Sequence, residues 1–312
     1  MKNNAYEISK CPLCTSKNLK EVDNTLRHTS NYKPVLCQEC SLIFLDKLYF
    51  TSQEKLDDFY KGEYLNEYYN DGKNDILFNF NNKLPYQNLR KERISNYLNN
   101  DTKVLDIGCG PGYFLESIRA DVAEVAGVEK NHDERRFVSD YLKIPCYEDH
   151  TMIKKKYDVI VLNQVVEHIY NPVFFLIELS SILSEKGVFV IEVPSASNPI
   201  VSLYRNKPFT NFWFQEPHLW YFNKITLRLI LEKAFGDKCV QSISVFQESS
   251  FLNHYNWIVH NKKSSSRDQA TSNSFPLVNV SNHSIMDDLD SLFVNFNMKY
   301  KDILEKGIPC LQ

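Results

Sequence analysis

A glycine-rich turn between an expected strand and an expected helix constrains this sequence more than any other feature. The turn, Gly108-Cys-Gly-Pro-Gly112, follows the aliphatic run 103–107 and precedes the helical pattern 113–118. Glycine is needed where the backbone takes a positive φ or must approach a ligand closely. The helix after such a turn points its free N–H groups at whatever the turn holds. The stretch therefore predicts a nucleotide-type binding site.

Two acidic residues near this turn suit a nucleoside ligand. Asp106 precedes the turn, and Glu129 closes the next apolar run, 124–129. An acidic side chain at the end of a second strand, about 20 residues further on, is placed to accept hydrogen bonds from both ribose hydroxyls. The candidate cofactor-binding residues of this part are Asp106, Gly108, Gly110, Gly112 and Glu129.

With these residues and the run 157–168, the sequence resembles the class I S-adenosylmethionine-dependent methyltransferases. Residues 106–112 follow that family's D-x-G-x-G-x-G pattern, and Tyr113 stands where NAD-binding proteins carry a third glycine. Residues 157–168 resemble the family's fourth strand and its frequent Glu-His pair. The resemblance implies an α/β fold with a doubly wound, mainly parallel Rossmann-like sheet, and S-adenosylmethionine as the cofactor.

Further cofactor residues follow from the same resemblance. An acidic or polar residue after the third strand meets the adenine amine in this family, which nominates Glu148 or Asp149, with a solvated turn as the alternative. Asn163 lies at the carboxyl end of the fourth expected strand, the edge where open α/β sheets bind ligands. The tyrosine-rich segment 59–69 is similar to one that closes over the cofactor, although a surface helix with exposed aromatics explains it equally well.

Two C-x-x-C pairs near the N-terminus predict a metal site. They are Cys11-Pro-Leu-Cys14 and Cys37-Gln-Glu-Cys40, and the four thiolates suit tetrahedral Zn²⁺ with no coordination position left open. The intervening strand-like runs are too small to form a core alone, so a structural zinc would supply the folding energy of a small zinc ribbon. Redox exchange between two dithiols is the alternative. Ribbons of this kind often precede methyltransferase domains in sugar-modifying enzymes.

Methyl transfer to oxygen or carbon requires a base, and histidine is the commonest group for that task. His168, beside Glu167, follows the fourth expected strand, whereas His218 lies in an aromatic segment, three residues before Tyr221. We place His168 ahead of His218 because a strand end is held more rigidly than a loop. In the alternative, His168 shapes the pocket or caps a helix, and His218 anchors the aromatic segment.

The remaining organisation follows from composition and periodicity. The aromatic segment 194–222 suits a lid or a sugar-binding wall, or simply a cover for the sheet. Helices are expected at 86–98 and 287–305 and strands at 187–193 and 240–246, and the family's seventh strand is reduced or missing. The expected parts are a zinc ribbon (1–50), a connector (51–84), a cofactor-binding domain (85–261), a flexible loop (262–284) and the C-terminal helix of that domain (285–312).

Net charge and hydropathy limit the classes of partner that this chain is expected to bind. A net charge of −3 gives no basic excess for nucleic acid, and no apolar run reaches the ~18 residues of a membrane span. The first ten residues lack the apolar core of a secretion signal, so a cytoplasmic protein is expected. We expect a small-molecule acceptor, most plausibly a sugar or sugar-nucleotide. The alternatives are a non-catalytic cofactor-binding protein whose ribbon docks a partner, and an NAD-type oxidoreductase, which Tyr113 disfavours.

Overall fold

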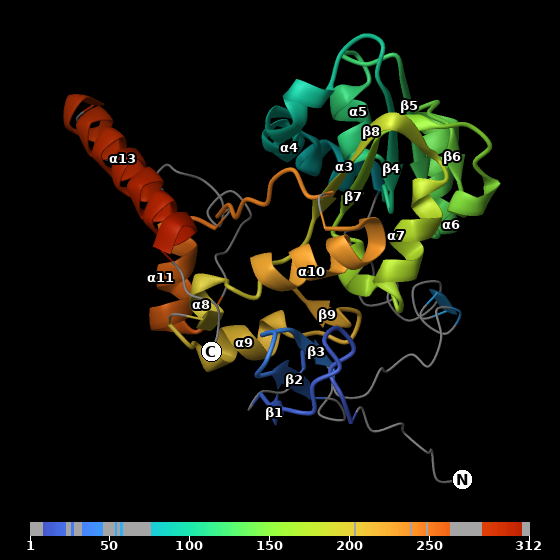
Figure 1. Ribbon diagram of the computed structural model, residues 1–312. Coiled ribbons are helices and arrows are strands. Elements are labelled where there is room, and N and C mark those ends of the chain that lie inside the picture. The colour runs from blue at the N-terminus through green and yellow to red at the C-terminus, as the bar shows by residue number, and fades with distance from the viewer. Residues whose placement is uncertain are drawn as a thin grey trace. The chain divides into compact units, whose positions relative to one another are not determined.

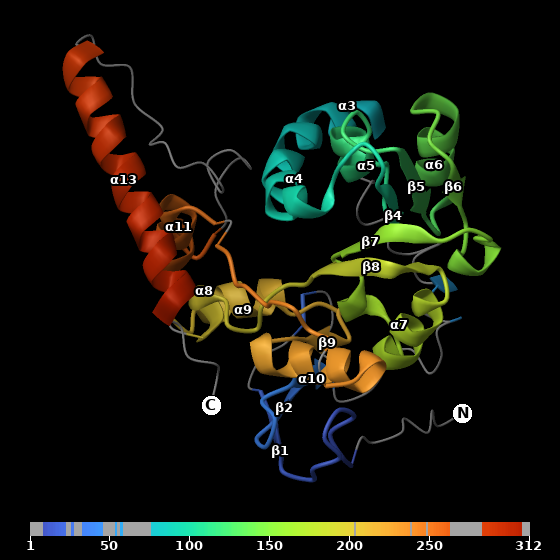
Figure 2. The same cartoon turned by 45° about the horizontal axis from the view of Figure 1, so that its top comes forward.

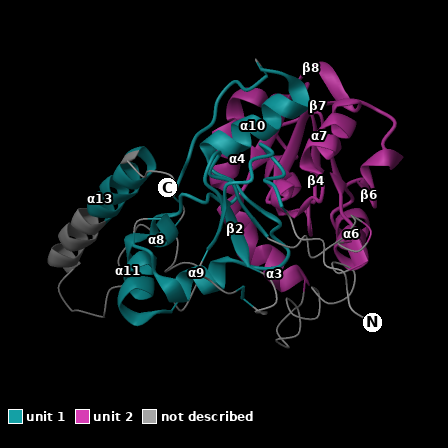
Figure 3. Ribbon diagram, turned by 60° about the horizontal axis from the view of Figure 1, so that its bottom comes forward, with its two compact units in different colours: residues 1–49, 194–312 teal, residues 50–193 magenta. Residues whose placement is uncertain are grey.

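The structure, a computed structural model, has two compact units, formed by residues 50–193 and by residues 1–49 with 194–312 (Figure 3). It describes residues 9–22, 26–27, 33–45, 54, 57–58, 76–202, 204–237, 239–247, 249–262 and 283–307. The tyrosine-rich segment 59–69 lies outside these ranges. The boundaries expected at residues 50, 84, 261 and 284 stay a prediction.

The unit 50–193 is built on a five-stranded sheet in which every neighbouring pair is parallel. The strand order is β6-β5-β4-β7-β8, so β4 lies in the middle. The strands are β4 (Lys103–Ile107), β5 (Glu124–Val128), β6 (Cys146–Tyr147), β7 (Tyr157–Asn163) and β8 (Leu183–Glu192). The predicted mainly parallel Rossmann-like sheet is therefore confirmed.

Central strands of a parallel sheet are covered on both faces, which is why β4 and β7 are nearly continuous apolar runs. Figure 2 shows α3, α4 and α5 on one side of the sheet and α7 on the other. The helices are α3 (Ile76–Lys83), α4 (Asn88–Ile94), α5 (Tyr113–Ile118), α6 (His132–Arg136) and α7 (Pro172–Ser180). Single turns lie at Leu84–Gln87, Ser95–Tyr97, Phe137–Tyr141, His150–Met152 and Val166–His168.

Because all these strands run the same way, their carboxyl ends share one edge. The residues that follow β4, β5, β6 and β7 begin at positions 108, 129, 148 and 164. This edge is where such sheets bind ligands. The chain thereby brings the glycine turn, Glu129, Glu148, Asp149 and the 164–168 turn to one side of the sheet.

The other unit contains a four-stranded antiparallel sheet of order β1-β2-β3-β9 (Figure 1). Its strands are β1 (Leu19–Glu21), β2 (Pro34–Cys37), β3 (Ile43–Leu45) and β9 (Trp220–Tyr221). Its helices are α8 (Pro199–Ser202), α9 (Lys207–Trp213), α10 (Lys224–Phe235), α11 (Phe251–His260) and α13 (His283–Gly307). Cys37, at the end of β2, thus belongs to the same sheet as Trp220 and Tyr221 of the aromatic segment.

One local expectation was wrong, and two other elements have bounds that differ from the expected ones. Residues 240–246 form no strand, because no described segment pairs with them. The helix expected over 86–98 is broken into a 3₁₀ turn, α4 and a second 3₁₀ turn, and helical structure already begins at Ile76. β8 starts at Leu183, four residues before the expected strand.

Among the described helices, none combines the length and apolar character needed to cross a membrane.

Candidate functional site

The glycine turn joins β4 to α5 as expected, and all three of its glycines have a positive φ: 68° at Gly108, 54° at Gly110 and 82° at Gly112. A Cβ at Gly108 would lie 2.7 Å from Val165 Cγ2, and one at Gly112 would lie 2.9 Å from Leu142 Cδ1. These two glycines are therefore required by packing as well as by backbone conformation.

Glu129 closes the turn from the neighbouring strand. Its carboxylate accepts hydrogen bonds from Gly110 N at 2.9 Å and from Asn131 N at 2.7 Å. Burial raises the pKa of Glu129, and these N–H donors act against that rise. The side chain is thus fixed directly after β5, where the family resemblance expects the ribose-binding acid.

Asp106, the last acidic residue of β4, is buried beneath the turn. Within the described chain, its Oδ1 has no hydrogen-bond partner. Burial raises its pKa to about 8, the Arg90 guanidinium opposes the rise and the Glu129 carboxylate adds to it. Asp106 does not line the cavity described next.

A cavity of about 560 Å³ opens at the carboxyl edge of the sheet, entirely within the unit 50–193. This volume suits a ligand of nucleoside size. Of the predicted cofactor residues, Gly108, Gly110, Glu129 and Asp149 line it. Asp106, Gly112, Glu148 and Asn163 do not.

The cavity is acidic. Among the described residues that line it, the charged ones are the carboxylates Asp57, Glu129, Glu134, Asp149 and Glu178 and the lysines Lys83 and Lys130. Five carboxylates and two lysines give a formal charge of −3 when histidine is neutral. Such a lining favours a cationic ligand over a polyphosphate. This charge is one physical argument against the NAD-type alternative.

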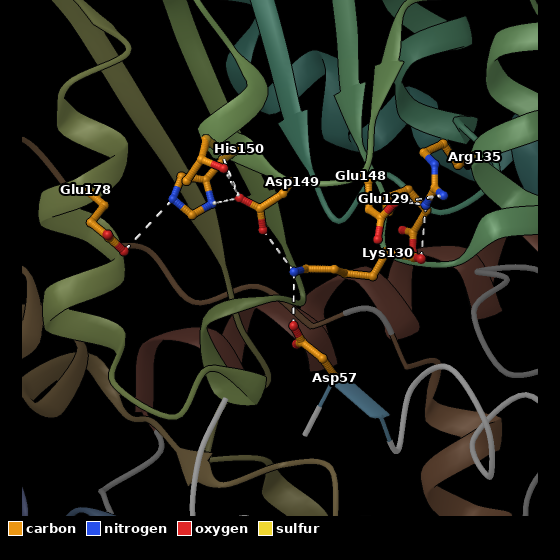
Figure 4. A network of polar contacts seen from close by, with 9 residues as sticks. Asp57, Glu129, Lys130, Arg135, Glu148, Asp149, His150 and Glu178 are labelled. Atoms are coloured by element: carbon orange, nitrogen blue, oxygen red, sulfur yellow. Dashed lines mark hydrogen bonds and ion pairs between the residues drawn. The ribbon is translucent and has the colours of Figure 1, made fainter. Parts of the chain in front are cut away.

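One wall carries a network of charged side chains (Figure 4). The Lys130 ammonium lies 3.0 Å from Asp57 Oδ2 and 2.9 Å from Asp149 Oδ2. Burial disfavours the charge on Lys130, but the two carboxylates outweigh burial and raise its pKa. Burial likewise acts against the charge of Asp149, yet its hydrogen bonds with Thr151 and Lys130 lower its pKa. Asp149 is therefore a fixed carboxylate.

His150 continues this network toward α7. Its Nδ1 lies 3.5 Å from Asp149 Oδ1, and its Nε2 lies 3.9 Å from Glu178 Oε2. The ring meets Phe175 edge-on at 5.3 Å between centroids. Sequence reasoning missed Lys130, His150 and Glu178 because only the fold brings them together. Glu148 instead pairs with Arg135 at 3.3 Å, which places Asp149 nearer than Glu148 to any ligand in the cavity.

The Glu-His pair lies in the turn after β7. His168 lines the cavity, and its Nε2 is 3.7 Å from Glu167 Oε1. Glu167 is fully buried, and neither carboxylate oxygen has a hydrogen-bond partner in the described chain. Burial raises the pKa of Glu167 to about 8, and the nearby Glu192 carboxylate adds to the rise. Asn163 was expected to face the ligand, but the next residue, Gln164, lines the cavity.

His218 and Tyr221 belong to the other unit. The His218 ring is 2.7 Å from the Gln215 amide nitrogen. The Tyr221 hydroxyl donates to Gln215 O at 3.0 Å and accepts from Gln215 N at 2.8 Å. Tyr221 is buried, and both hydrogen bonds hold the bend that precedes β9. Catalytic roles for these two residues stay a prediction.

The four N-terminal cysteines converge within that same unit. Cys11 Sγ is 3.6 Å from Cys40 Sγ, Cys14 Sγ is 3.5 Å from Cys37 Sγ, and all four sulfurs lie within 4.8 Å of one another. Four thiolates at the Zn–S length of about 2.3 Å would stand about 3.8 Å apart. The cluster therefore fits a small zinc ribbon.

Known proteins match this chain in sequence and structure. The family described as "Methyltransferase domain" matches residues 82–241. The ubiquinone biosynthesis O-methyltransferase of Glaesserella parasuis is 32% identical over 119 residues, 30% of this chain and 49% of that protein. The protein of the same description from Pelagibacter ubique is 35% identical over 97 residues, 28% of this chain and 40% of that protein. This chain thus spans about half the length, or less, of these curated relatives.

A solved S-adenosylmethionine-dependent methyltransferase from Archaeoglobus fulgidus is 24% identical, with a TM-score of 0.43 over 72% of this chain and 93% of that one. The family match is the stronger finding, because it covers slightly more than half of the present sequence. It includes the glycine turn, Glu129 and the Glu-His pair. The chain therefore belongs to the methyltransferase domain family.

Proposed function

We propose that this chain is an S-adenosylmethionine-dependent methyltransferase that modifies an oxygen atom of a small hydroxylated acceptor, and that the acceptor is a sugar or sugar-nucleotide. The four-cysteine cluster that fits a zinc ribbon carries the sugar assignment, because ribbons of this kind often precede methyltransferase domains in sugar-modifying enzymes. The names of the two curated relatives, both O-methyltransferases, support oxygen as the methylated atom.

S-adenosylmethionine would occupy the acidic cavity. Gly108, Gly110 and Glu129 would hold the nucleoside, and Asp149 would face the adenine. The cofactor supplies a methyl group that its sulfonium already activates. At neutral pH it carries one net positive charge, which the −3 lining favours. The protein must then align the acceptor oxygen with the methyl group and remove the hydroxyl proton.

We assign proton removal to His168, whose ring lies at the cavity wall beside a buried carboxyl group. Burial raises the pKa of the neighbouring Glu167 carboxyl group to about 8, so this group carries its proton at neutral pH. His218 and Tyr221 stay candidates for acceptor binding from the aromatic segment.

We further propose that Cys11, Cys14, Cys37 and Cys40 bind one structural zinc ion.

A second candidate for the acceptor is an intermediate of ubiquinone biosynthesis, which the names of the curated relatives favour.

The test is methyl transfer from radiolabelled S-adenosylmethionine to a panel of nucleotide sugars and quinone precursors. His168→Ala should bind the cofactor normally and lose roughly 10²–10⁴-fold in rate. His132→Ala, an exposed histidine on α6, is the matched control and should keep the wild-type rate. Transfer only to quinone precursors would overturn the sugar assignment, and cofactor binding without any turnover would favour the non-catalytic alternative. A fully active His168→Ala variant would remove that residue as the base.

A further inference from the structure

Gln164 has an unusual backbone conformation for its position. Six non-glycine residues in the described chain have a positive φ, and Gln164, at 58°, is the one among them that lines the cavity. The left-handed region is unfavourable for a residue with a Cβ, and it persists where the surroundings over-determine it. Glycine would adopt this conformation at lower cost. The glutamine side chain must therefore contribute something that glycine lacks.

The Gln164 side chain makes a second hydrogen bond to Glu192, the last residue of β8. Gln164 N donates to the Glu192 carbonyl oxygen at 2.8 Å, and its side-chain amide donates to Glu192 Oε1 at 3.2 Å. Arg90, on α4, holds that carboxylate in turn, since its Nε lies 3.1 and 3.2 Å from the two oxygens. The Glu192 and Arg90 side chains are only 11% and 22% exposed, so solvent screens the pair weakly.

Gln164 is the first residue of the turn 164–168, and this turn contacts the glycine turn 108–112. Val165, the next residue, packs so closely on Gly108 that a Cβ there would be 2.7 Å from Val165 Cγ2. His168 N then donates to Val165 O at 2.9 Å and closes the turn. Gln164, Val165 and His168 all line the cavity. A change at Gln164 would therefore be transmitted to the surface that receives the cofactor.

We propose that Gln164 is a positioning residue for S-adenosylmethionine binding and that Glu192, oriented by Arg90, acts through it. The left-handed backbone of Gln164 and its hydrogen bonds to Glu192 together hold the turn 164–168 against the glycine turn. This inference rests on the family's cofactor and not on the acceptor or the base proposed above. Its failure and theirs are therefore distinguishable.

The test is a double-mutant cycle on the full chain, with Gln164→Gly, Glu192→Gln and the double variant. Calorimetry measures the Kd of S-adenosylmethionine, and thermal melts measure stability. Gln164→Gly should weaken binding about tenfold while the Tm stays nearly unchanged, because relief of backbone strain offsets the lost hydrogen bond. Glu192→Gln should weaken binding several-fold in the wild-type background and hardly at all when residue 164 is already glycine. Glu116→Gln, which breaks an exposed ion pair with Arg119 in the same unit, is the matched control for loss of a carboxylate.

Two results would overturn the inference. One is a Kd within twofold of wild type in both single variants, even if their Tm falls. The hydrogen bond between Gln164 and Glu192 would then contribute to stability and not to cofactor binding. The other is a Glu192→Gln effect of equal size with and without the glutamine, since Glu192 would then act by another route.

Discussion

Replacing Asp106 by asparagine should change how the free energy of unfolding depends on pH. In the folded chain, burial raises the pKa of Asp106 from its ordinary value of 3.8 to about 8, against the Arg90 guanidinium and with the Glu129 carboxylate. Between these two values the folded state holds a proton that the unfolded state has released. Stability must therefore fall as pH rises through this range.

The magnitude follows from one proton per molecule. The free energy of unfolding should lose about 1.4 kcal/mol per pH unit from this group alone, or roughly 4 kcal/mol between pH 5 and pH 8. An asparagine cannot ionise, so the variant should lack this part of the slope. Its stability relative to wild type should rise steadily with pH.

Urea unfolding at pH 5, 6, 7 and 8, followed by circular dichroism, measures the two slopes. Tryptophan fluorescence would report the wrong unit, since all three tryptophans, Trp213, Trp220 and Trp257, lie outside residues 50–193. Asp101→Asn, an exposed aspartate two residues before β4, is the control and should follow wild type. If wild type and Asp106→Asn gave parallel pH profiles, the buried carboxyl group would be ionised in the folded protein and the reasoning would be refuted.

Three further outcomes are expected. Glu129→Ala removes a half-buried, charged acceptor and should weaken S-adenosylmethionine binding by roughly tenfold to a hundredfold in calorimetry; unchanged affinity would place the ribose elsewhere. Gly108→Ala should lower both Tm and cofactor affinity, because the added Cβ meets Val165 and the positive φ disfavours alanine; a variant with wild-type Tm would contradict this packing. Cys37→Ser should reduce bound zinc from about one equivalent and alter Trp220 fluorescence through β3 and β9 while cofactor affinity persists; zinc-free wild-type protein with an undisturbed spectrum would end the metal proposal.

Local sequence signals predicted the parallel sheet well. The run 103–107, the glycine turn and the helix from Tyr113 are determined by neighbouring residues, and the structure has them at the expected positions. The strand expected at 240–246 was wrong because a strand also needs a distant partner, and alternation along the chain does not supply one. The pairing of β3 with β9 was equally invisible to local patterns.

Local sequence patterns were also insufficient to predict every residue that lines the cavity. Glu129 could be nominated because it closes a recognisable apolar run, and Asp149 was nominated with Glu148 because the family resemblance places an acidic residue after the third strand. Asn163 was nominated in place of Gln164, since successive side chains of a strand alternate in direction and one residue decides which faces the ligand. The contact of Lys130 with Asp57 spans 73 residues, a separation that no spacing rule covers.

The pairing of β3 with β9 has a consequence for how the chain must be synthesised. About 175 residues separate Leu45 from Trp220, and translation at 5–20 residues per second needs roughly 10–35 s to produce them. During that interval β3 is an unpaired edge, and its residues Ile43, Phe44 and Leu45 are all fully buried in the finished protein. An apolar open edge is a template for association between nascent chains. Fragments that end before residue 220 should therefore aggregate even when their cysteines hold metal, and the ribbon cannot be produced as an independent module by cutting the chain after residue 50.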